Sequence, residues 1–340
     1  MDARILRVAV TPPAFCKSSQ LKDELTRHFP NSVFNETDRY LSVPELIALL
    51  ADADTALIGR DAINAELIGS LPKLRMISKY GVGLDNLDQE AMRRANIDFR
   101  ATPGNNKRSV AELTLGFMLG LCHNMSSCSE ELKRGIWYRD GGQELTGKTV
   151  GVIGCGHVGQ ELIRLLQPFQ CKVKVRDIAD RSNFCHEWDA LEVDFSEIIA
   201  EADILTLHVP LTEETENFIN KAVFAKMKTS AYLINTSRGK VVHQGDLHQA
   251  LVTGEIAGAG LDVFWQEPPT DMDFLQLPNL MVTPHIGGNA HEAVAAVAAI
   301  DVETAQKALD LIEIEYEELP AYFTADDAIA EGVVPLHEKR

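Results

Sequence analysis

Apolar positions along the chain follow two alternating periodicities. Short runs of β-branched and aliphatic residues predict buried strands, and apolar residues at helical spacing predict helices between them. In the first third of the chain, strands are expected at 4–11, 55–59 and 74–80, and helices at 18–28, 43–51, 62–70 and 88–95. From residue 149 about six strands are expected, at 149–153, 171–176, 204–209, 231–235, 258–263 and 280–283, with helices at 157–167, 223–227 and 244–252. This alternation predicts an α/β fold of two doubly wound, parallel-sheet, Rossmann-like domains with a cleft between them.

The breaker sequence Thr102-Pro103-Gly104 lies between the two series and suits a hinge. We expect residues 1–103 together with 286–340 to form the first domain, and residues 104–285 to form the second. Residues 109–133 have the composition of one long helix that ends at Gly135. Its apolar residues go most of the way around, which fits either a core helix or a helix buried against a partner chain or between domains.

A glycine cluster follows the strand at 149–153. Gly154, Gly156 and Gly159 have the spacing G-x-G-x-x-G on a strand-to-helix turn, which is typical of dinucleotide binding. Gly154 allows the tight turn, Gly156 lets a pyrophosphate approach the backbone, and Gly159 lets the helix pack on the sheet. Asp177 ends the next strand, about 20 residues further on, where an acidic residue binds ribose hydroxyls. Its negative charge favours NAD, although Arg176 and Arg181 leave NADP open. In the simpler alternative, Asp177 is only a solvated carboxylate at the end of a strand.

Composition restricts the partners. The chain has 340 residues, of which 45% are hydrophobic, and a formal net charge of -18. Neither nucleic acid nor an anionic membrane suits so acidic a protein, and no apolar run is long enough for a membrane span. The six cysteines form no C-x-x-C pair, so neither a zinc site nor a disulfide framework is expected. We expect a cytoplasmic protein with no metal site and a small-molecule substrate that is held by local cations and backbone amides.

Three polar residues follow strands of the second series. Arg238 follows 231–235, Glu267 follows 258–263, and His285 follows 280–283. Ligands of doubly wound sheets lie at the carboxyl ends of the strands, so these side chains should converge where a nicotinamide would lie. Histidine can exchange the hydroxyl proton of a 2-hydroxy acid, glutamate favours the imidazolium and fixes its tautomer, and arginine offers a planar fork to a carboxylate or carbonyl oxygen. Each residue alone is weak evidence for a site. Only the position that all three share, directly after strands of the sheet, indicates one.

The motifs in this order resemble the D-isomer-specific 2-hydroxyacid dehydrogenase family. They are the glycine turn at 154–159, HVPLT at 208–212, INTSRG at 234–239, LDVF-x-x-EP at 261–268 and TPHIGG at 283–288. The resemblance implies that Arg238, Glu267 and His285 are catalytic and that NAD is the cofactor. It assigns to the cofactor Gly154, Gly156, His157, Val158, Gly159, Asp177, His208, Val209, Pro210, Thr215, Thr236, Ser237, Arg238, Asp262, His285 and Gly287. It assigns to the substrate Arg60, Tyr80, Gly81, Val82, Gly83 and Asn106, and it implies a homodimer through the helix that Asn106 opens.

Within the family, GVGLDN and NKRSVAEL are most similar to the phosphoglycerate dehydrogenases. Arg60 stands alone where that group has an arginine pair, so 3-phosphoglycerate is one candidate among several small D-2-hydroxy acids. The tail departs from the family: residues 294–340 resemble a short segment of molybdenum hydroxylase large subunits, without a molybdenum site. Residues 290–312 are helical by composition, and we expect the tail to pack on the first domain without a catalytic role.

Other functions stay open at this stage. A formate or phosphite dehydrogenase shares the scaffold, but formate enzymes have a glutamine–histidine pair, and Glu267 argues against that branch. A nicotinamide-sensing binding protein, like the transcriptional corepressors of the same fold, would bind NADH and a partner protein without turnover. In a further alternative, the unusual tail spoils domain closure and leaves an inactive product.

Overall fold

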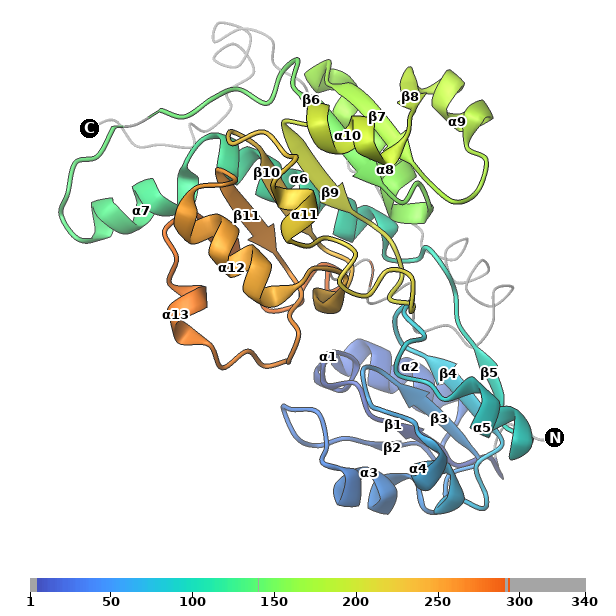
Figure 1. Ribbon diagram of the computed structural model, residues 1–340. Helices are drawn as coiled ribbons and strands as arrows, with labels where there is room; N and C mark the ends of the chain where they lie inside the picture. Colours follow the sequence, from blue (N-terminus) through green and yellow to red (C-terminus); the bar gives the residue numbers. More distant parts are fainter. Residues whose placement is uncertain (1–4, 140, 291–292, 294–340) are drawn as a thin grey trace, which may run out of the picture.

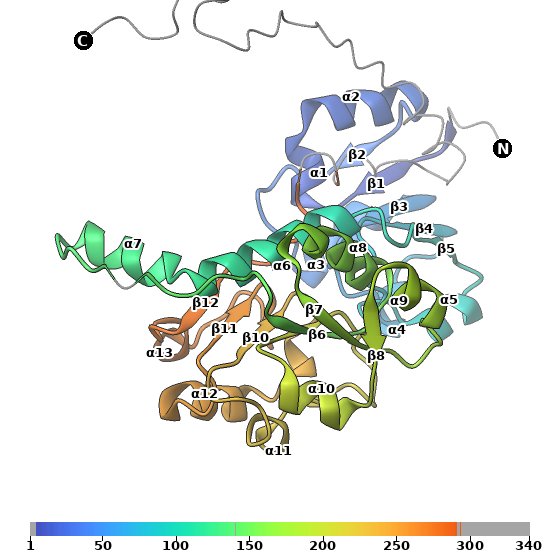
Figure 2. The same cartoon turned by 90° about the horizontal axis from the view of Figure 1, so that it is seen from above.

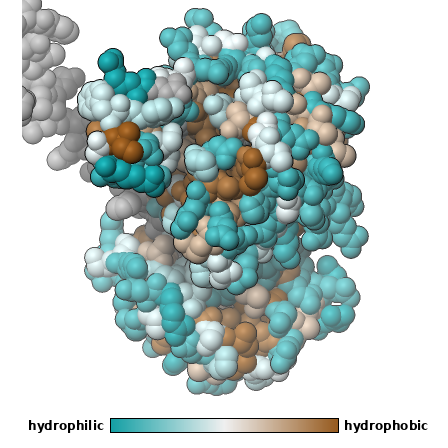
Figure 3. Space-filling model, turned by 60° about the vertical axis from the view of Figure 1, so that its left-hand side comes forward, coloured by the Kyte–Doolittle hydropathy of each residue, from teal (hydrophilic) through white to brown (hydrophobic). Residues whose placement is uncertain are grey.

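The computed structural model describes residues 5–139, 141–290 and 293 of the chain. They form two α/β lobes (Figure 1), one from the first 100 residues and one from the strands that begin at residue 149. A groove separates the lobes in the space-filling view (Figure 3). The expected fold of two parallel-sheet α/β domains is therefore confirmed, while the exact boundaries at residues 103 and 285 stay a prediction.

The first lobe is built on a five-stranded sheet with the order β2-β1-β3-β4-β5 and parallel pairing throughout. Its strands are β1 (Val8–Val10), β2 (Val33–Phe34), β3 (Thr55–Ile58), β4 (Met76–Lys79) and β5 (Asp98–Arg100). Its helices are α1 (Pro13–Lys17), α2 (Ser19–His28), α3 (Val43–Leu50), α4 (Ala65–Gly69) and α5 (Gln89–Arg94). Every residue of β1 is buried, as expected for a strand that is covered on both faces. The strand order reverses between β1 and β3, which is where such a sheet binds ligands.

The second lobe has a seven-stranded parallel sheet with the order β12-β11-β10-β9-β6-β7-β8. Its strands are β6 (Thr149–Ile153), β7 (Lys172–Arg176), β8 (Ala190–Glu192), β9 (Ile204–Leu207), β10 (Tyr232–Asn235), β11 (Gly258–Leu261) and β12 (Leu280–Val282). Its helices after β6 are α8 (His157–Leu166), α9 (Ser182–Glu187), α10 (Phe195–Glu201), α11 (Lys221–Phe224), α12 (Gln244–Thr253) and α13 (Met272–Leu275), with 3-10 turns at Gln167–Phe169 and Gly239–Val241. The expected count of about six strands missed β8, a short edge strand with two exposed residues of three.

The single helix expected at 109–133 is wrong. The chain forms two helices, α6 (Lys107–Cys122) and α7 (Met125–Lys133). They separate at Asn124, whose φ of 53° lies in the left-handed region that an α-helix cannot continue through. Helix α6 is a core helix that packs on α8 and the sheet, whereas α7 has no buried residue and projects from the second lobe (Figures 1 and 2). The interpretation as a core helix therefore holds for α6, while burial of this segment against a partner chain stays a prediction.

The expectations for the tail lie outside the described residues. They concern a helix at 290–312, the packing of residues 294–340 on the first domain and the resemblance of this segment to molybdenum hydroxylases. The assignment of 286–340 to the first domain falls largely in the same stretch.

Candidate functional site

The glycine turn lies where the strand order of the second sheet reverses, between β6 and β9. Gly154 has a φ of 93°, and a Cβ atom there would come within 2.5 Å of the His208 carbonyl oxygen. A Cβ at Gly159 would collide with the Gly154 carbonyl. At Gly156, by contrast, a Cβ would meet nothing within 4 Å, so bare backbone borders open space at the start of α8. The turn therefore offers backbone N–H groups and room, which is what a bound phosphate needs.

The amino end of α8 carries no side-chain cap. Gly156 is its N-cap residue, and His157 and Val158 supply the first helical N–H groups, which form the positive end of the helix dipole. The His157 ring is exposed and lies against Gly104, where φ is 82° and a Cβ would come within 2.8 Å of the imidazole. His157 therefore brings the glycine turn into contact with the segment around Gly104 that joins the two lobes.

Asp177 follows β7 and binds back to the glycine turn. Its Oδ2 accepts the Cys155 N–H at 2.7 Å and lies 3.4 Å from Arg181 Nε, and its Oδ1 accepts the Ala179 N–H at 2.8 Å. The side chain is only 9% exposed. Asp177 therefore holds the turn in shape and places a carboxylate beside it, where the ribose of a dinucleotide is expected.

The loop after β9 lies against the glycine turn. His208 N–H donates to the Ile153 carbonyl at 2.7 Å, and His208 Nε2 lies 3.1 Å from Thr206 Oγ1. Burial lowers the pKa of His208 to about 3, so its ring is neutral at physiological pH. The side chain of the next residue, Val209, borders the same turn. His208 is consequently a neutral hydrogen-bonding group rather than a phosphate-binding cation.

Three hydroxyl groups that the sequence assigns to the cofactor hold loops of the second lobe together. Thr215 Oγ1 donates to the Pro210 carbonyl at 2.7 Å, and Ser237 Oγ donates to Asn235 Oδ1 at 2.7 Å. Thr236 Oγ1 lies 3.0 Å from Thr114 Oγ1. These bonds shape the carboxyl end of the sheet where the glycine turn also lies.

Glu267 and His285 are in direct contact. His285 Nδ1 lies 2.8 Å from Glu267 Oε2 and 2.9 Å from Oε1, and Glu267 Oε1 also accepts the Phe264 N–H at 3.2 Å. A carboxylate can only accept, so Nδ1 carries the proton in this pair. No described residue hydrogen-bonds to Nε2. Although burial favours a neutral Glu267, its hydrogen bond with His285 and the nearby charges outweigh burial and hold the pKa of Glu267 below its usual value.

Arg60 crosses from the first lobe to this pair. Its Nη1 donates to Glu267 Oε2 and lies 3.2 Å from His285 Nδ1. Its guanidinium stacks on the Tyr40 ring with 4.7 Å between the guanidinium carbon and the ring centroid. The structure thus brings three residues of the predicted site together from both lobes.

Asp262 fixes the turn that presents His285. It is 1% exposed, its Oδ1 accepts Thr283 Oγ1 at 2.6 Å and the Ile286 N–H at 2.8 Å, and its Oδ2 accepts the Gly287 N–H at 2.8 Å. Burial raises the pKa of Asp262, although these hydrogen bonds oppose the shift. His285 itself has a φ of 54°, a left-handed conformation that the clamped turn sustains.

Arg238 also reaches across the groove. Its Nε donates to Asp85 Oδ1 at 2.9 Å, and its Nη2 lies 2.8 Å from the same oxygen. Gly83 lies directly against it, since a Cβ at Gly83 would overlap the guanidinium. The expected substrate loop, which starts at Gly81 with a φ of 105° and includes Val82, is therefore in contact with the expected catalytic arginine.

Two predicted substrate residues contain buried polar atoms without a hydrogen-bond partner among the described residues. One is the Tyr80 hydroxyl, which lies in a ring cluster with Phe15 at 6.2 Å between centroids. The other is Asn106 Oδ1, at the start of α6, with its amide nitrogen beside Gly288. Asn106 therefore adjoins the turn that follows His285.

A family model described as "D-isomer specific 2-hydroxyacid dehydrogenase, NAD binding domain" matches residues 115–287. The chain is 35% identical over 315 residues to the hydroxypyruvate reductase of Thermotoga maritima, which covers 90% of this chain and 99% of that protein. The chain belongs to the D-isomer-specific 2-hydroxyacid dehydrogenase family.

Two further proteins are similar to this member of the D-2-hydroxyacid dehydrogenase family. It is 37% identical over 273 residues to the D-3-phosphoglycerate dehydrogenase of Methanocaldococcus jannaschii, which covers 79% of this chain but 52% of that enzyme. The chain thus spans about half the length of that relative. The crystal structure of D-lactate dehydrogenase from Aquifex aeolicus, complexed with NAD and lactic acid, superposes with a TM-score of 0.75 at 25% identity and covers 89% of this chain and 94% of that one.

Sequence patterns alone missed several residues of this candidate site. Asp85 lies in the GVGLDN stretch, but its pairing with Arg238 depends on how the lobes meet. Tyr40, which supports Arg60, gives no local signal. Asp61 is buried, and its Oδ2 accepts from Thr11 Oγ1 and from the Gly59 N–H at 3.0 Å, so it shapes the turn that carries Arg60. A polar residue directly after an apolar strand was the only available signal for Asp61.

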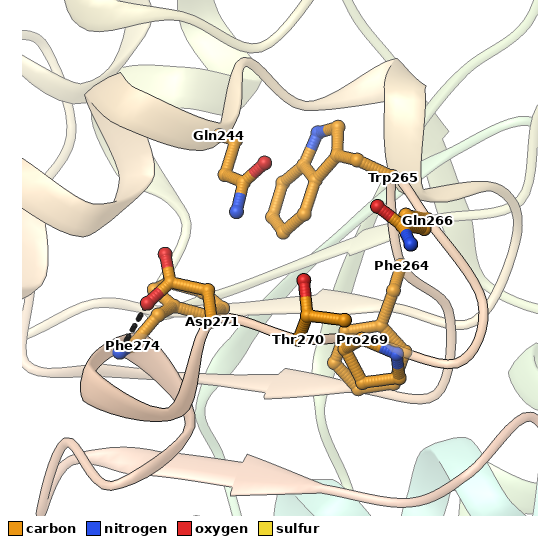
Figure 4. Close-up of a pocket in the computed structure, with 8 residues that line it drawn as sticks. All are labelled: Gln244, Phe264, Trp265, Gln266, Pro269, Thr270, Asp271 and Phe274. Carbon is orange, nitrogen blue, oxygen red and sulfur yellow. Dashed lines mark hydrogen bonds between the residues drawn. The ribbon is translucent and has the colours of Figure 1, made fainter.

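A separate hollow lies beside the loop that carries Glu267 (Figure 4). It is lined by Gln244, Phe264, Trp265, Gln266, Pro269, Thr270, Asp271 and Phe274. Only Asp271 among these can ionise, and its Oδ1 accepts the Phe274 N–H at 3.1 Å. In the described part of the chain, no cluster of three or more His, Cys, Asp or Glu side chains could hold a metal, and no helix there has both the length and the apolar character of a membrane span.

Proposed function

We propose that this chain is an NAD-dependent oxidoreductase that interconverts a small D-2-hydroxy acid and its 2-keto acid. The observation that supports this most is the Glu267–His285 pair at the groove, with Nδ1 turned to the carboxylate. The family of the chain and the open phosphate turn at Gly156 support the nicotinamide part of the proposal.

The proposed proton path runs through His285. Because Glu267 accepts from Nδ1, Nε2 is the ring nitrogen that remains to face a substrate. In reduction Nε2–H donates a proton to the carbonyl oxygen at C2, and in oxidation Nε2 accepts the hydroxyl proton. Bound NADH supplies the hydride to C2. The Glu267 carboxylate keeps the ring oriented and offsets the positive charge of the imidazolium.

The proposed substrate contacts come from both walls of the groove. The N–H groups of Val82 and Gly83 hold the carboxylate, and the Arg238 guanidinium polarises the C2 oxygen. The contact between Gly83 and Arg238 supports this assignment, since one small anion can then meet both groups. Arg60 and Asn106 would face the remainder of the substrate.

We propose NAD rather than NADP as the preferred cofactor. Asp177 puts a fixed negative charge beside the glycine turn, which would repel a ribose 2′-phosphate. Arg181, the nearest cation, lies 3.4 Å from that carboxylate, which partly neutralises it. Binding constants for NADH and NADPH test this choice, and tighter binding of NADPH would contradict it.

For the substrate we propose an unphosphorylated keto acid such as hydroxypyruvate or glyoxylate. The hydroxypyruvate reductase of Thermotoga maritima, which is 35% identical over 315 residues, supports this choice. Arg60 is also engaged by Glu267 and Tyr40, which leaves it less available for a phosphate. Phosphohydroxypyruvate is the competing substrate.

The test is an NADH oxidation panel with hydroxypyruvate, glyoxylate, pyruvate, 2-oxoglutarate and 3-phosphohydroxypyruvate. We expect the highest kcat/KM with hydroxypyruvate or glyoxylate. A preference for the phosphorylated acid would move the chain to the phosphoglycerate dehydrogenase branch. NADH binding without turnover on any acid, together with NADH-dependent association with another protein, would support the sensor alternative instead.

We also propose a homodimer that covers α7. Met125 and Leu132 of this projecting helix are 57% and 55% exposed, and Ile136 and Trp137 after it are 51% and 77% exposed. An apolar surface of this kind favours contact with another chain. Light scattering of the full chain should give twice the monomer mass, and Leu132→Glu should shift it toward the monomer. A monomer before any substitution would exclude the proposal.

A further inference from the structure

Lys79 is a buried cation that lacks a carboxylate partner. It ends β4, opposite Ile58 of β3 in the parallel register, and is 5% exposed. Its Nζ donates to the Gly59 carbonyl, and within the described residues it forms no ion pair with any carboxylate. An ammonium that is removed from water without an anion is costly, so such a residue calls for a compensating charge.

Charged groups approach Lys79 from both lobes. Arg60 and Asp61 come from the loop after β3, Asp85 comes from the loop after β4, and Arg238 comes from the second lobe. Burial first, and then the charge of Arg238, lower the pKa of Lys79 to about 8, although Asp85 and Asp61 oppose the shift. Asp85 binds Arg238, and Asp61 binds its own turn through Oδ2, while its Oδ1 has no hydrogen-bond partner among the described residues.

The loop that follows Lys79 is the one proposed to hold the substrate carboxylate. Gly81 begins it two residues later, and Gly83 touches the Arg238–Asp85 pair. An anion bound on this loop would lie in the same charge cluster as the buried ammonium. Coulomb interactions are strong there, because little water screens them.

We propose that Lys79 determines substrate affinity, with its buried ammonium acting as the counter-charge of the carboxylate that binds on the Gly81–Gly83 loop. This inference rests on the proposed function. The bound anion favours the protonated amine, so substrate binding is coupled to proton uptake wherever the free enzyme has lost the Lys79 proton. The role concerns binding, while proton transfer to C2 oxygen stays with His285.

The experiment compares wild type with Lys79→Met and Lys79→Arg on the best keto acid of the panel. Wild-type KM should rise about tenfold between pH 7 and pH 9, because the proton of Lys79 is lost over that range. Lys79→Met, whose apolar side chain has a similar length, should raise KM at least about tenfold at pH 7, with no further rise to pH 9 and with kcat and NADH affinity little changed. Lys79→Arg should keep the low KM and lose the pH dependence.

Asn86 supplies the matched control. Its amide donates to the same Gly59 carbonyl at 3.1 Å but carries no charge. If Lys79 only positioned this carbonyl and Arg60 next to it, Asn86→Ala and Lys79→Met should act alike. We expect Asn86→Ala to retain the pH dependence of KM.

An unchanged KM in Lys79→Met, or a pH dependence equal to that of wild type, would overturn the inference. Absence of wild-type turnover on every acid would instead count against the proposed function. In that case oxalate, added to the NADH-saturated protein, is the probe: Lys79→Met should bind it at least about tenfold more weakly, and equal affinity of the two proteins would reject the role of Lys79.

Discussion

Arg238 and Asp85 join the two lobes through one carboxylate oxygen. Arg238 Nε and Nη2 lie 2.9 Å and 2.8 Å from Asp85 Oδ1, and the pair borders the Gly81–Gly83 loop. Arg60 and Glu267 form a second pair with the charges exchanged between the lobes. The groups proposed for catalysis are therefore held in register across the groove by charge-assisted hydrogen bonds.

Replacement of Asp85 tests how far Arg238 depends on this pair. Asp85→Asn keeps an acceptor but removes its charge, so we expect Arg238 to lose orientation and kcat/KM to fall about tenfold. The control is Asp38→Asn, because Asp38 is 87% exposed in its pair with Lys17 and lies on the surface. Steady-state kinetics of the two variants measure the difference, and equal kcat/KM values in Asp85→Asn and wild type would contradict the prediction.

The same pair has a pH dependence with a defined sign. Burial would raise the pKa of Asp85, but the hydrogen bond and charge of Arg238 outweigh burial and lower it. A carboxyl with a lower pKa in the folded state stabilises the protein above its unfolded pKa of about 4, and this stabilisation is lost as the pH falls through the folded pKa. Wild type should thus be more stable than Asp85→Asn at pH 6 to 7, and acid titration should bring the two curves together below about pH 4.

Removal of the proposed proton carrier should stop turnover but leave cofactor binding. His285→Asn is the suitable change, because asparagine tolerates the φ of 54° at this position. We expect kcat to fall at least about a hundredfold, since general acid–base catalysis is lost. NADH affinity, measured by fluorescence titration, should change little. His186→Asn on exposed α9 serves as the control, and a His285→Asn variant with more than a tenth of wild-type kcat would exclude the role.

Two glycines can be compared, Gly156 in the glycine turn and Gly116 in α6. Gly156→Ala puts a methyl group into open space at an extended backbone position, so the fold should be retained. If the pyrophosphate lies there, the methyl group should weaken NADH binding at least about tenfold. Gly116→Ala, on an exposed position of α6, should instead stabilise the protein by about 0.5–1 kcal/mol without changing NADH affinity. Calorimetric NADH binding that is unaffected by Gly156→Ala would rule out the assigned cofactor position.

Much of the fold follows from local sequence. The apolar runs at 149–153 and 231–235 match β6 and β10 closely, because buried parallel strands read as continuous apolar segments. The break between α6 and α7 was not predicted, because Asn124 differs from its neighbours in backbone conformation and not in the periodicity of apolar residues. Strand β8 was not predicted either, because an exposed edge strand has few apolar residues.

The candidate site also contains residues whose positions could be predicted from the sequence and residues whose positions could not. Gly154 and Asp177 belong to one strand–helix–strand unit, and Asp177 binds back to the glycine turn, so their spacing alone indicates their geometry. The approach of Arg60 to Glu267 and of Arg238 to Asp85 joins residues from different lobes, and only the assembled fold brings them together. Lys79 is visible in the sequence as a lysine at a strand end, but its burial shows only in the folded structure.

Asp262 offers a test of how His285 is positioned. Its two oxygens accept three hydrogen bonds from the turn at 283–287, so replacement should act on His285 without touching the imidazole. In Asp262→Asn the amide nitrogen cannot accept the Gly287 N–H, and we expect a loss of about 1–3 kcal/mol in the free energy of unfolding. We also expect kcat to fall about tenfold through the displaced turn, with NADH affinity less affected.

Asp271→Asn is the matched control for this last prediction. Asp271 caps α13 by accepting the Phe274 N–H, and asparagine caps a helix about as well as aspartate does. It lies on the same lobe, and its hydrogen bond within the described residues goes to Phe274 rather than to the His285 turn, so both stability and kcat should stay near wild type. Urea unfolding and steady-state kinetics of the two variants give the comparison. If Asp262→Asn also kept both quantities, His285 would owe its position to other contacts than this carboxylate.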